Sequence, residues 1–258
     1  MTIMSANMSF DEKIEKLLKY ILEGDVVFFG GAGVSTASGM KDFRSEDGLY
    51  KEKNKYKDSP ETILSKNFFF QHPTEFYQFY REKMNCLPFE PNVIHKVLAE
   101  LEKRGLLKAV ITQNIDNLHQ RAGSVNVIEL HGTSMKNYCT QCGEPHSIDD
   151  VFYGKNKFPK CEKCGGLVRP GITLYDERLD MEKFEQARQA LNKAKTCIVA
   201  GTSLQVFPAA SLISDFYGQN LVILNKEKVA NEEWADIICR ENMKDVFDAL
   251  AKKLNINV

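Results

Sequence analysis

Short apolar runs alternate with helix-like segments along most of this 258-residue chain. Strands are predicted over residues 26–29, 107–112, 125–130, 196–200, 221–224 and 236–239, and helices over 92–104, 182–194, 207–217 and 243–254. A further helix is expected to follow the capping-box pair Ser9 and Glu12 and to end at Gly24. Such alternation favours parallel strand pairing. The pattern therefore predicts an α/β fold with a doubly wound parallel sheet.

Two stretches interrupt this alternation. Residues 46–90 hold aromatic and charged segments such as NFFFQHPTEFYQFYREK, which are typical of amphipathic helices. Residues 137–168 are rich in Cys, Gly and Lys and have too little apolar content for a core of their own. We therefore expect a main domain of residues 1–45, 91–136 and 169–258, with 46–90 as a helical insertion and 137–168 as a small module that needs a cross-link.

Four cysteines supply a candidate cross-link. Cys139, Cys142, Cys161 and Cys164 form the pattern C-x2-C-x18-C-x2-C, a spacing typical of a tetrahedral four-thiolate zinc site. A site filled by four sulfur ligands has no open position for water, so the zinc is expected to be structural. Paired disulfides or a redox-active CxxC are the alternatives. Cys86, Cys197 and Cys239 lie in apolar settings and are expected to be inert core residues.

The charge balance argues against a nucleic-acid partner. The net charge is −1 and the pI is near 6.5, so a basic stripe for phosphate contacts is not expected. No stretch reaches the roughly 18 apolar residues that a membrane span needs, and the N-terminal residues do not resemble a signal peptide. With cysteines arranged as metal ligands, these features predict a cytoplasmic protein without a membrane partner. An obvious coiled coil is absent from the sequence, and a monomer is expected.

Polar side chains follow two neighbouring predicted strands. Gln113, Asn114, Asp116 and His119 come directly after the strand at 107–112, and His131 follows the strand at 125–130. Ligands and catalytic groups in open α/β sheets lie at the carboxyl ends of the strands. His131 is the group best suited to proton transfer near neutral pH, whereas His119 is expected to support its loop. The remaining histidines, including His95, are expected at the surface or in helix caps.

A glycine-rich loop, GGAGVSTASG, follows the first predicted strand. It differs from the dehydrogenase pattern G-x-G-x-x-G because Thr36 stands at the third glycine. Gly31 and Gly33 permit close approach to a pyrophosphate, and a helix N-terminus after the loop would favour its charge. The alternative is a tight turn with Ser35 as a helix N-cap. Further ligand contacts are expected just beyond this loop, at Asp42, Phe43 and Arg44. They are also expected after the strand at 196–200, at Gly201, Thr202 and Ser203, and after the strand at 221–224, at Asn225.

Taken together, GAGVSTASG, DFRS, TQNIDNLH, the HG at 131–132, the four cysteines, GTSLQVFPAA and LVILN resemble the sirtuin family in order and spacing. The resemblance extends over residues 10–250. It implies a Rossmann-like domain with a zinc-bearing module, and NAD as a consumed co-substrate. It also implies deacylation of acyl-lysine proteins or peptides. The acyl-lysine oxygen attacks C1′ of the nicotinamide ribose, nicotinamide leaves, and the acyl group is transferred to ADP-ribose.

The resemblance also implies roles for individual residues. His131 would act as the general base on a ribose hydroxyl, and Asn114 and Asp116 would hold the ribose and nicotinamide ends of NAD. Phe43 and Ile115 would wall the nicotinamide pocket. The remaining NAD contacts would be Ala32, Gly33, Ser35, Thr36, Arg44, Gln113, Gly201, Thr202, Ser203 and Asn225.

The chain departs from the family pattern at two places. Lys41 replaces a proline in the cofactor loop, which predicts a less rigid loop before NAD binds. The segment RPGITLYDERLD stands where many sirtuins have a proline-aspartate, two valines and phenylalanine-glycine-glutamate. Ile172, Thr173, Leu174 and Tyr175 of this segment would contact the substrate. Thr173 adds a polar group to a wall that is usually aliphatic, so we hypothesise an altered acyl preference.

Three other functions compete with an NAD-dependent deacylase, for which deacetylation is the expected reaction. A mono-ADP-ribosyltransferase could use the same scaffold, but it would have less need of the ribose base at His131. A non-catalytic NAD-sensing module is a second alternative. An ordinary dehydrogenase is disfavoured because the glycine pattern differs from that of dehydrogenases.

Overall fold

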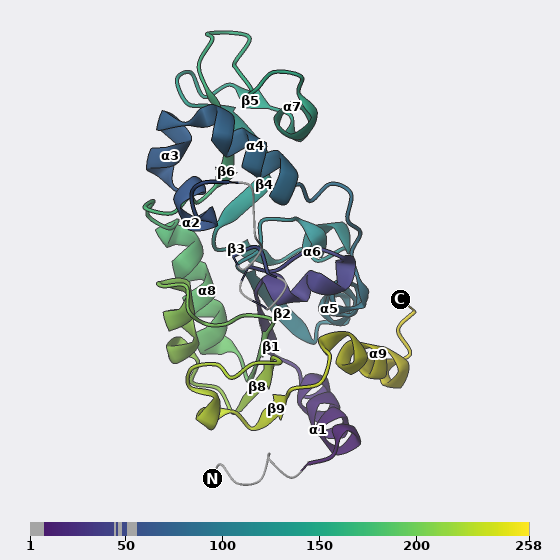
Figure 1. The fold of residues 1–258 in the computed structure, drawn as a ribbon. Coiled ribbons are helices and arrows are strands. Elements are labelled where there is room, and N and C mark those ends of the chain that lie inside the picture. Colours follow the sequence, from purple (N-terminus) through teal and green to yellow (C-terminus); the bar gives the residue numbers. More distant parts are fainter. Residues whose placement is uncertain (1–7, 44, 46–47, 51–55, 258) are drawn as a thin grey trace.

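A computed structural model describes residues 8–43, 45, 48–50 and 56–257, and its largest element is a six-stranded parallel sheet (Figure 1). The strands are β1 (Val26–Gly30), β2 (Leu107–Thr112), β3 (Val127–Glu129), β7 (Thr196–Ala200), β8 (Asn220–Leu224) and β9 (Ile237–Cys239). Their order is β3-β2-β1-β7-β8-β9, and every neighbouring pair is parallel. The six predicted strands and the α/β fold class are therefore confirmed.

Helices cover both faces of this sheet. Figure 1 shows α1 (Phe10–Leu22), α5 (Val93–Lys103) and α9 (Met243–Leu254) on one side and α8 (Met181–Lys193) on the other. Successive side chains of a strand point to opposite faces. Accordingly, Val26 and Phe28 pack in the core with α1, α5 and α9, whereas Val27 and Phe29 pack in the core with α8. The fully buried apolar runs of the sequence are explained by this two-sided burial.

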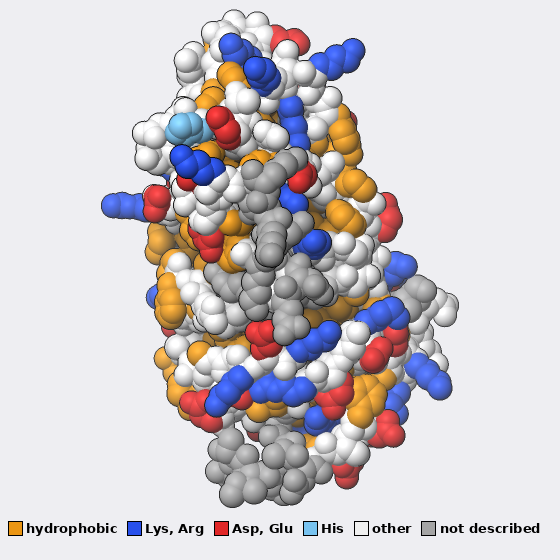
Figure 2. Space-filling model, in the orientation of Figure 1, with side chains coloured by type: hydrophobic (Ala, Val, Ile, Leu, Met, Phe, Trp, Pro, Cys, Tyr) orange, Lys and Arg blue, Asp and Glu red, His pale blue; other side chains and the backbone are white. Residues whose placement is uncertain are grey.

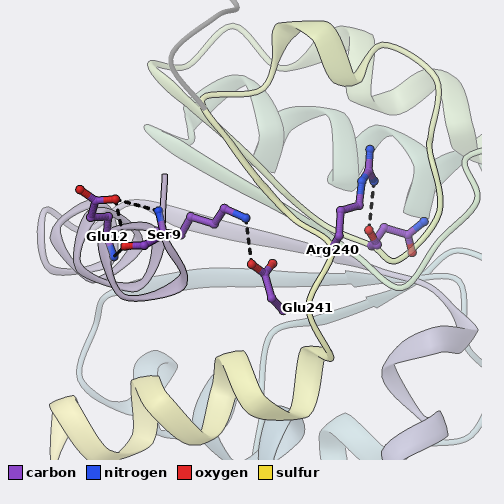
Figure 3. Close-up of polar contacts among 6 residues, drawn as sticks. Ser9, Glu12, Arg240 and Glu241 are labelled. Atoms are coloured by element: carbon purple, nitrogen blue, oxygen red, sulfur yellow. Dashed lines mark hydrogen bonds and ion pairs between the residues drawn. The ribbon is translucent and has the colours of Figure 1, made fainter. Parts of the chain in front are cut away.

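The predicted capping box starts α1. The Ser9 backbone N–H donates to Glu12 Oε2 at 2.7 Å, and the Glu12 N–H donates to Ser9 Oγ at 3.3 Å (Figure 3). The helix ends at Leu22, and Gly24 has a φ of +79°, a conformation that glycine adopts without steric strain. The predicted helix and its stop at Gly24 are confirmed.

A smaller lobe lies beyond one end of the sheet (Figure 1). It contains a three-stranded antiparallel sheet, β5-β4-β6, and four short helices around an aromatic core that includes Phe69, Phe76, Tyr77 and Tyr80. Its elements are α2 (Pro60–Ile63), α3 (Lys66–Gln71), α4 (Pro73–Lys83), β4 (Gly132–Cys139), β5 (Pro145–His146), α7 (Ile148–Tyr153) and β6 (Val168–Ile172). The helices expected within 46–90 are thus found within 60–83. The predicted division of the chain into domains stays a prediction. Strand β4 spans the predicted domain boundary at 136, and β6 spans the one at 169.

Two predicted helices take a different form. The glycine loop continues into the short 3-10 turns η2 (Ala32–Val34) and η3 (Thr36–Ser38), which Gly39 ends with a φ of +94°. Since these turns are too short for a helix dipole, the predicted helix N-terminus is wrong. Ser35 makes no side-chain capping bond there. The α-helix predicted over 207–217 is instead the 3-10 helix η4 (Ala209–Asp215). In it the Ser211 hydroxyl donates to the Pro208 carbonyl at 2.7 Å and competes with helical backbone bonding.

Two histidines meet in the core. His95 caps α5, since its Nδ1 accepts the Asn92 N–H at 3.3 Å, which agrees with the capping alternative, and it is 0% exposed. His119, in α6 (Leu118–Arg121), is 1% exposed, and its ring centroid lies 4.7 Å from that of His95. In the described part of the chain, neither ring nitrogen of His119 has a hydrogen-bond partner. His119 therefore supports its loop by packing.

The visible surface carries intermixed lysine, arginine, aspartate and glutamate side chains (Figure 2). This mixture agrees with the net charge of −1. Among the described residues, no helix combines the length and the apolar character that crossing a membrane would require.

Candidate active site

A cleft of about 730 Å³ opens between the carboxyl ends of the large sheet and the smaller lobe. The described residues to which the family resemblance assigned NAD or substrate contacts all line it, as does Asp42: Ala32, Gly33, Ser35, Thr36, Asp42, Phe43, Gln113, Asn114, Ile115, Asp116, His131, Ile172, Thr173, Leu174, Tyr175, Gly201, Thr202, Ser203 and Asn225. Gly31 is not among the lining residues. Arg44 lies outside the described residues. Leu64, Met84 and Cys86 also line the cleft, although sequence reasoning did not assign them to it. Burial raises the pKa of Cys86 to about 11, so its thiol stays protonated near neutral pH.

Two glycines let the loop after β1 touch the loop after β7. A Cβ on Gly31 would lie 2.7 Å from Cβ of Thr202, and one on Gly33 would lie 2.8 Å from Cα of Gly201. The Gly33 N–H also donates to the Gly201 carbonyl at 2.9 Å. Only glycine fits these contacts, which leave backbone on both loops close to the cleft. The close approach of the chain to a ligand thus comes from packed loops and not from a helix end.

Ser35, Asn114 and Asp116 form a buried hydrogen-bond chain at the centre of the cleft. The Ser35 hydroxyl donates to Asp116 Oδ2 at 2.6 Å and accepts from Asn114 Nδ2 at 3.1 Å. Asp116 Oδ1 accepts the Leu118 N–H at 3.0 Å. Burial raises the pKa of Asp116, and the bonds from Ser35 and Leu118 oppose that rise. The chain fixes the side chains of the TQNID segment against the glycine loop.

His131 lies where β3 leads into β4. Its Nδ1 is 2.9 Å from the Gln113 carbonyl, which can only accept, so Nδ1 carries the proton and Nε2 is left as the acceptor. Burial lowers the pKa of His131, and the bond to Gln113 partly opposes this change. A neutral imidazole with a defined tautomer can act as a general base near pH 7.

Gln113 presents an unsatisfied donor within the cleft wall. Its Oε1 accepts the Thr202 hydroxyl at 2.9 Å, whereas its Nε2 is buried without a partner among the described residues. A buried amide without a partner is costly, and a ligand oxygen would satisfy it. With the close glycine backbones, this donor fits the phosphate or ribose oxygens of a dinucleotide.

Arg240 fixes the far end of the cleft. Its guanidinium donates to the backbone carbonyls of Asn225 and Glu227 at 3.0 and 2.7 Å and pairs with Glu232 of η5 (Glu232–Trp234). Figure 3 shows Arg240 with one of its polar contacts. These bonds hold the main chain after β8, where Asn225 lines the cleft. Arg240 was not predicted from the sequence. The available signal was that a basic residue directly follows the last predicted strand, at 236–239.

An ion pair fixes the predicted substrate segment at 172–175. Arg169 donates to both carboxylate oxygens of Glu177 at 2.8 and 2.9 Å, and also to the Ile172 carbonyl at 2.8 Å. Between them, Asp176 has a φ of +68°, which aspartate tolerates better than most residues with a side chain. The backbone of the segment is therefore compatible with an aspartate at this position. Sequence reasoning missed the Arg169–Glu177 pair.

The four cysteines of the predicted zinc site converge in the smaller lobe. All four Sγ atoms lie within 4.8 Å of one another, and the Cys139–Cys164 and Cys142–Cys161 pairs are 3.4 and 3.6 Å apart. A tetrahedral zinc ion with Zn–S bonds near 2.3 Å needs sulfur atoms roughly 3.8 Å apart, so the thiols fit the metal. The disulfide alternative is not supported, since all four are free cysteines.

The parallel sheet, the glycine-lined cleft at its carboxyl edge and the four-thiol cluster define a nucleotide-binding α/β protein with a structural metal site. Comparison with known families is more specific, because the model of the Sir2 family matches residues 31–208. The chain belongs to the Sir2 family, as the sirtuin resemblance predicted.

Individual relatives extend over nearly the whole chain. An NAD-dependent protein deacetylase of Clostridium acetobutylicum is 47% identical over 240 residues, which cover 93% of this chain and 98% of the relative. A structure of Sir2 with a deacetylated p53 peptide and 3′-O-acetyl-ADP-ribose is 35% identical, with a TM-score of 0.87 over 95% of this chain and 99% of its own. A structure of Sir2 with a p53 peptide and NAD+ is 35% identical, with a TM-score of 0.83 and coverage of 95% and 99%.

Proposed function

We propose that this protein is an NAD-dependent protein-lysine deacylase and that deacetylation is its main reaction. The observation that carries the proposal is the position of His131. Its Nδ1 is bound to Gln113 beside the Ser35–Asn114–Asp116 chain, and its backbone carbonyl accepts the Thr173 N–H of the substrate segment at 2.8 Å. The deacetylase relative and the Sir2 structure with an acetyl-ADP-ribose product support the same reaction.

The residues of the cleft divide the work of this reaction. In it, the acyl-lysine oxygen displaces nicotinamide from C1′ of the ribose, and the acyl group ends on ADP-ribose. Asn114 and Asp116 hold the ribose and nicotinamide ends of NAD, with Phe43 and Ile115 as the walls of the nicotinamide pocket. His131 Nε2 accepts the proton of a ribose hydroxyl, because Nδ1 is already committed to Gln113.

The other predicted contacts complete the site. Ala32, Gly33, Ser35, Thr36 and Gln113 approach NAD from the glycine-loop side, with Arg44 of the cofactor loop. Gly201, Thr202, Ser203 and Asn225 contact its adenosine side. In the smaller lobe, Cys139, Cys142, Cys161 and Cys164 would hold a zinc ion that stabilises the fold and takes no part in the chemistry, since four thiolates leave no open position.

We further propose a cytoplasmic location, which the free thiols of a metal-type cysteine cluster support. The monomeric state and the absence of nucleic-acid and membrane partners stay predictions.

The test is an incubation of the purified protein with NAD and an acetyl-lysine peptide, with mass-spectrometric detection of nicotinamide and deacylated peptide. We expect both products in equal amounts. His131→Ala should lower the rate by about 100-fold or more, the usual contribution of a general base, while its circular dichroism spectrum stays that of the folded protein. Nicotinamide release with ADP-ribose on protein and no deacylation would support the transferase instead, and neither product would support a sensor.

The acyl preference is a separate proposal. Thr173 lines the cleft and adds a hydroxyl to the predicted acyl wall. We expect the ratio of rates for acetyl, propionyl and longer acyl peptides to differ between the native enzyme and Thr173→Val. Equal ratios in the two proteins would refute this role.

A further inference from the structure

Two tyrosine hydroxyls meet across the cleft. Tyr175 Oη lies 2.5 Å from Tyr50 Oη, and both residues line the cleft wall. Tyr175 belongs to the substrate segment, whereas Tyr50 follows the predicted cofactor residues Asp42 and Phe43. The bond joins two walls of the cleft that are 125 residues apart in the sequence.

Tyr175 is the fixed partner. Its backbone N–H donates to the Leu64 carbonyl at 3.0 Å, and its carbonyl accepts the Lys66 N–H at 3.0 Å, so it pairs like a strand residue with the connection between α2 and α3. The adjacent Arg169–Glu177 ion pair fixes the same segment from its other end. The Tyr175 hydroxyl is therefore held at a defined point above the cleft.

Tyr50 connects the Tyr175 hydroxyl to Phe43 on the NAD side of the cleft. Its backbone N–H donates to the Phe43 carbonyl at 2.9 Å, and the two ring centroids are 5.5 Å apart. The Leu49 N–H donates to the Asp42 carbonyl at 2.9 Å. Phe43, the predicted wall of the nicotinamide pocket, is thus tied to Tyr50 by a backbone bond and by ring packing. Loss of the hydroxyl contact would release Phe43 and Tyr50 together and leave the backbone of Tyr175 in place.

We propose that Tyr50 and Tyr175 are positioning residues that set the nicotinamide wall of the site through their shared hydrogen bond. The inference rests on the proposed deacylase function and deepens it, since it adds two residues to the NAD side of the reaction. Their hydroxyls transfer no proton and contact no reacting atom. They act by holding Phe43 in the orientation that NAD needs.

The test compares Tyr175→Phe, Tyr50→Phe and the double variant in steady-state assays of nicotinamide release. A hydrogen bond of ordinary strength corresponds to about a fivefold change, so each single variant should raise KM for NAD about fivefold. Tyr50→Phe, which lies outside the substrate segment, should leave KM for the acetyl peptide within twofold. Because the two hydroxyls share one bond, the double variant should also show about a fivefold rise and not about 25-fold. Calorimetric titration with NAD alone should give the same ratios in Kd.

Tyr56→Phe is the matched control, because Tyr56 donates a comparable bond to Glu82 at 2.9 Å and does not line the cleft. It should keep the native KM for NAD. Unchanged KM and Kd for NAD in the single variants, multiplied effects in the double variant, or an equal rise in KM for peptide in Tyr50→Phe would each overturn the positioning role. A native enzyme that releases no nicotinamide and deacylates no peptide would contradict the proposed function itself, whereas its Kd for NAD would still test the tyrosine pair.

Discussion

Acidification is expected to destabilise this protein through the buried pair His95 and His119. Burial lowers the pKa of His95 from 6.5 to about 4, and burial together with the nearby His95 ring lowers the pKa of His119 well below its usual range. In the unfolded chain both imidazoles titrate near pH 6.5, so the unfolded state binds more protons below that pH. Full stability is therefore present above about pH 6.5 and is lost as the pH falls towards the folded values.

The size of the stability loss follows from the pKa of His95 in the folded state and in the unfolded state. Between pH 7 and pH 5 the unfolded state gains about 0.7 proton at this site, whereas the folded state gains only about 0.1. With a folded pKa of about 4, this difference lowers the free energy of unfolding by about 2 kcal/mol. His119 adds a loss of the same sign. Because His119 lies in α6, directly after the loop that carries Asn114 and Asp116, the same acidification should also impair the active site.

Urea unfolding at pH 7, 6 and 5 tests this reasoning in the native protein, in His95→Gln and in His72→Gln. Glutamine can accept the Asn92 N–H in place of His95 Nδ1 but cannot take up a proton. We expect His95→Gln to lose about 2 kcal/mol less than the native protein between pH 7 and pH 5. His72 is exposed, so His72→Gln should keep the native pH dependence. Zinc release affects all three proteins alike and cancels in the comparison. An identical pH dependence in His95→Gln and the native protein would refute the linkage.

Three other changes give separate tests. Gly33→Ala should raise Kd for NAD at least tenfold in a calorimetric titration, because its Cβ would lie 2.8 Å from Cα of Gly201 and would force the two loops apart. Ser35→Ala should lower the free energy of unfolding by about 1–3 kcal/mol and also reduce kcat/KM, because the Asp116 carboxylate and the Asn114 amide lose the hydroxyl that they share. Urea unfolding measures the first effect, and nicotinamide release measures the second. Cys139→Ala should lose zinc and lower activity indirectly, whereas Cys197→Ala should retain zinc in elemental analysis, and full zinc content in the first variant would contradict a structural site.

The sheet could be predicted because its strands are apolar on both faces and are separated by helical periodicity. Val26–Gly30 is buried at every position, and the same holds for Thr196–Ala200 and Asn220–Leu224. Parallel pairing then brings the carboxyl ends of the strands to one edge. For that reason the residues after β1, β2, β7 and β8 could be expected in a common cleft before any contact was known.

The contacts that hold those residues could not be predicted in the same way. Arg240 and Glu232, like Arg169 and Glu177, are pairs of charged residues eight positions apart, and no periodicity distinguishes them from solvated surface charges. The glycine loop misled the prediction of a helix for a related reason. Local sequence does not reveal that Gly33 packs on Gly201, a contact that sets the backbone path of the loop.

His131 joins the two halves of the site through its backbone as well as its side chain. Its Nδ1 is bound to the carbonyl of Gln113 on the NAD side, and its own carbonyl accepts the backbone N–H of Thr173 on the substrate side. Neither bond involves the side chain of Thr173. The acyl wall can therefore change its chemistry at Thr173 while the tautomer and the position of the base are maintained by backbone groups. A substitution at Thr173 is therefore compatible with an unchanged arrangement of Asn114, Asp116 and His131.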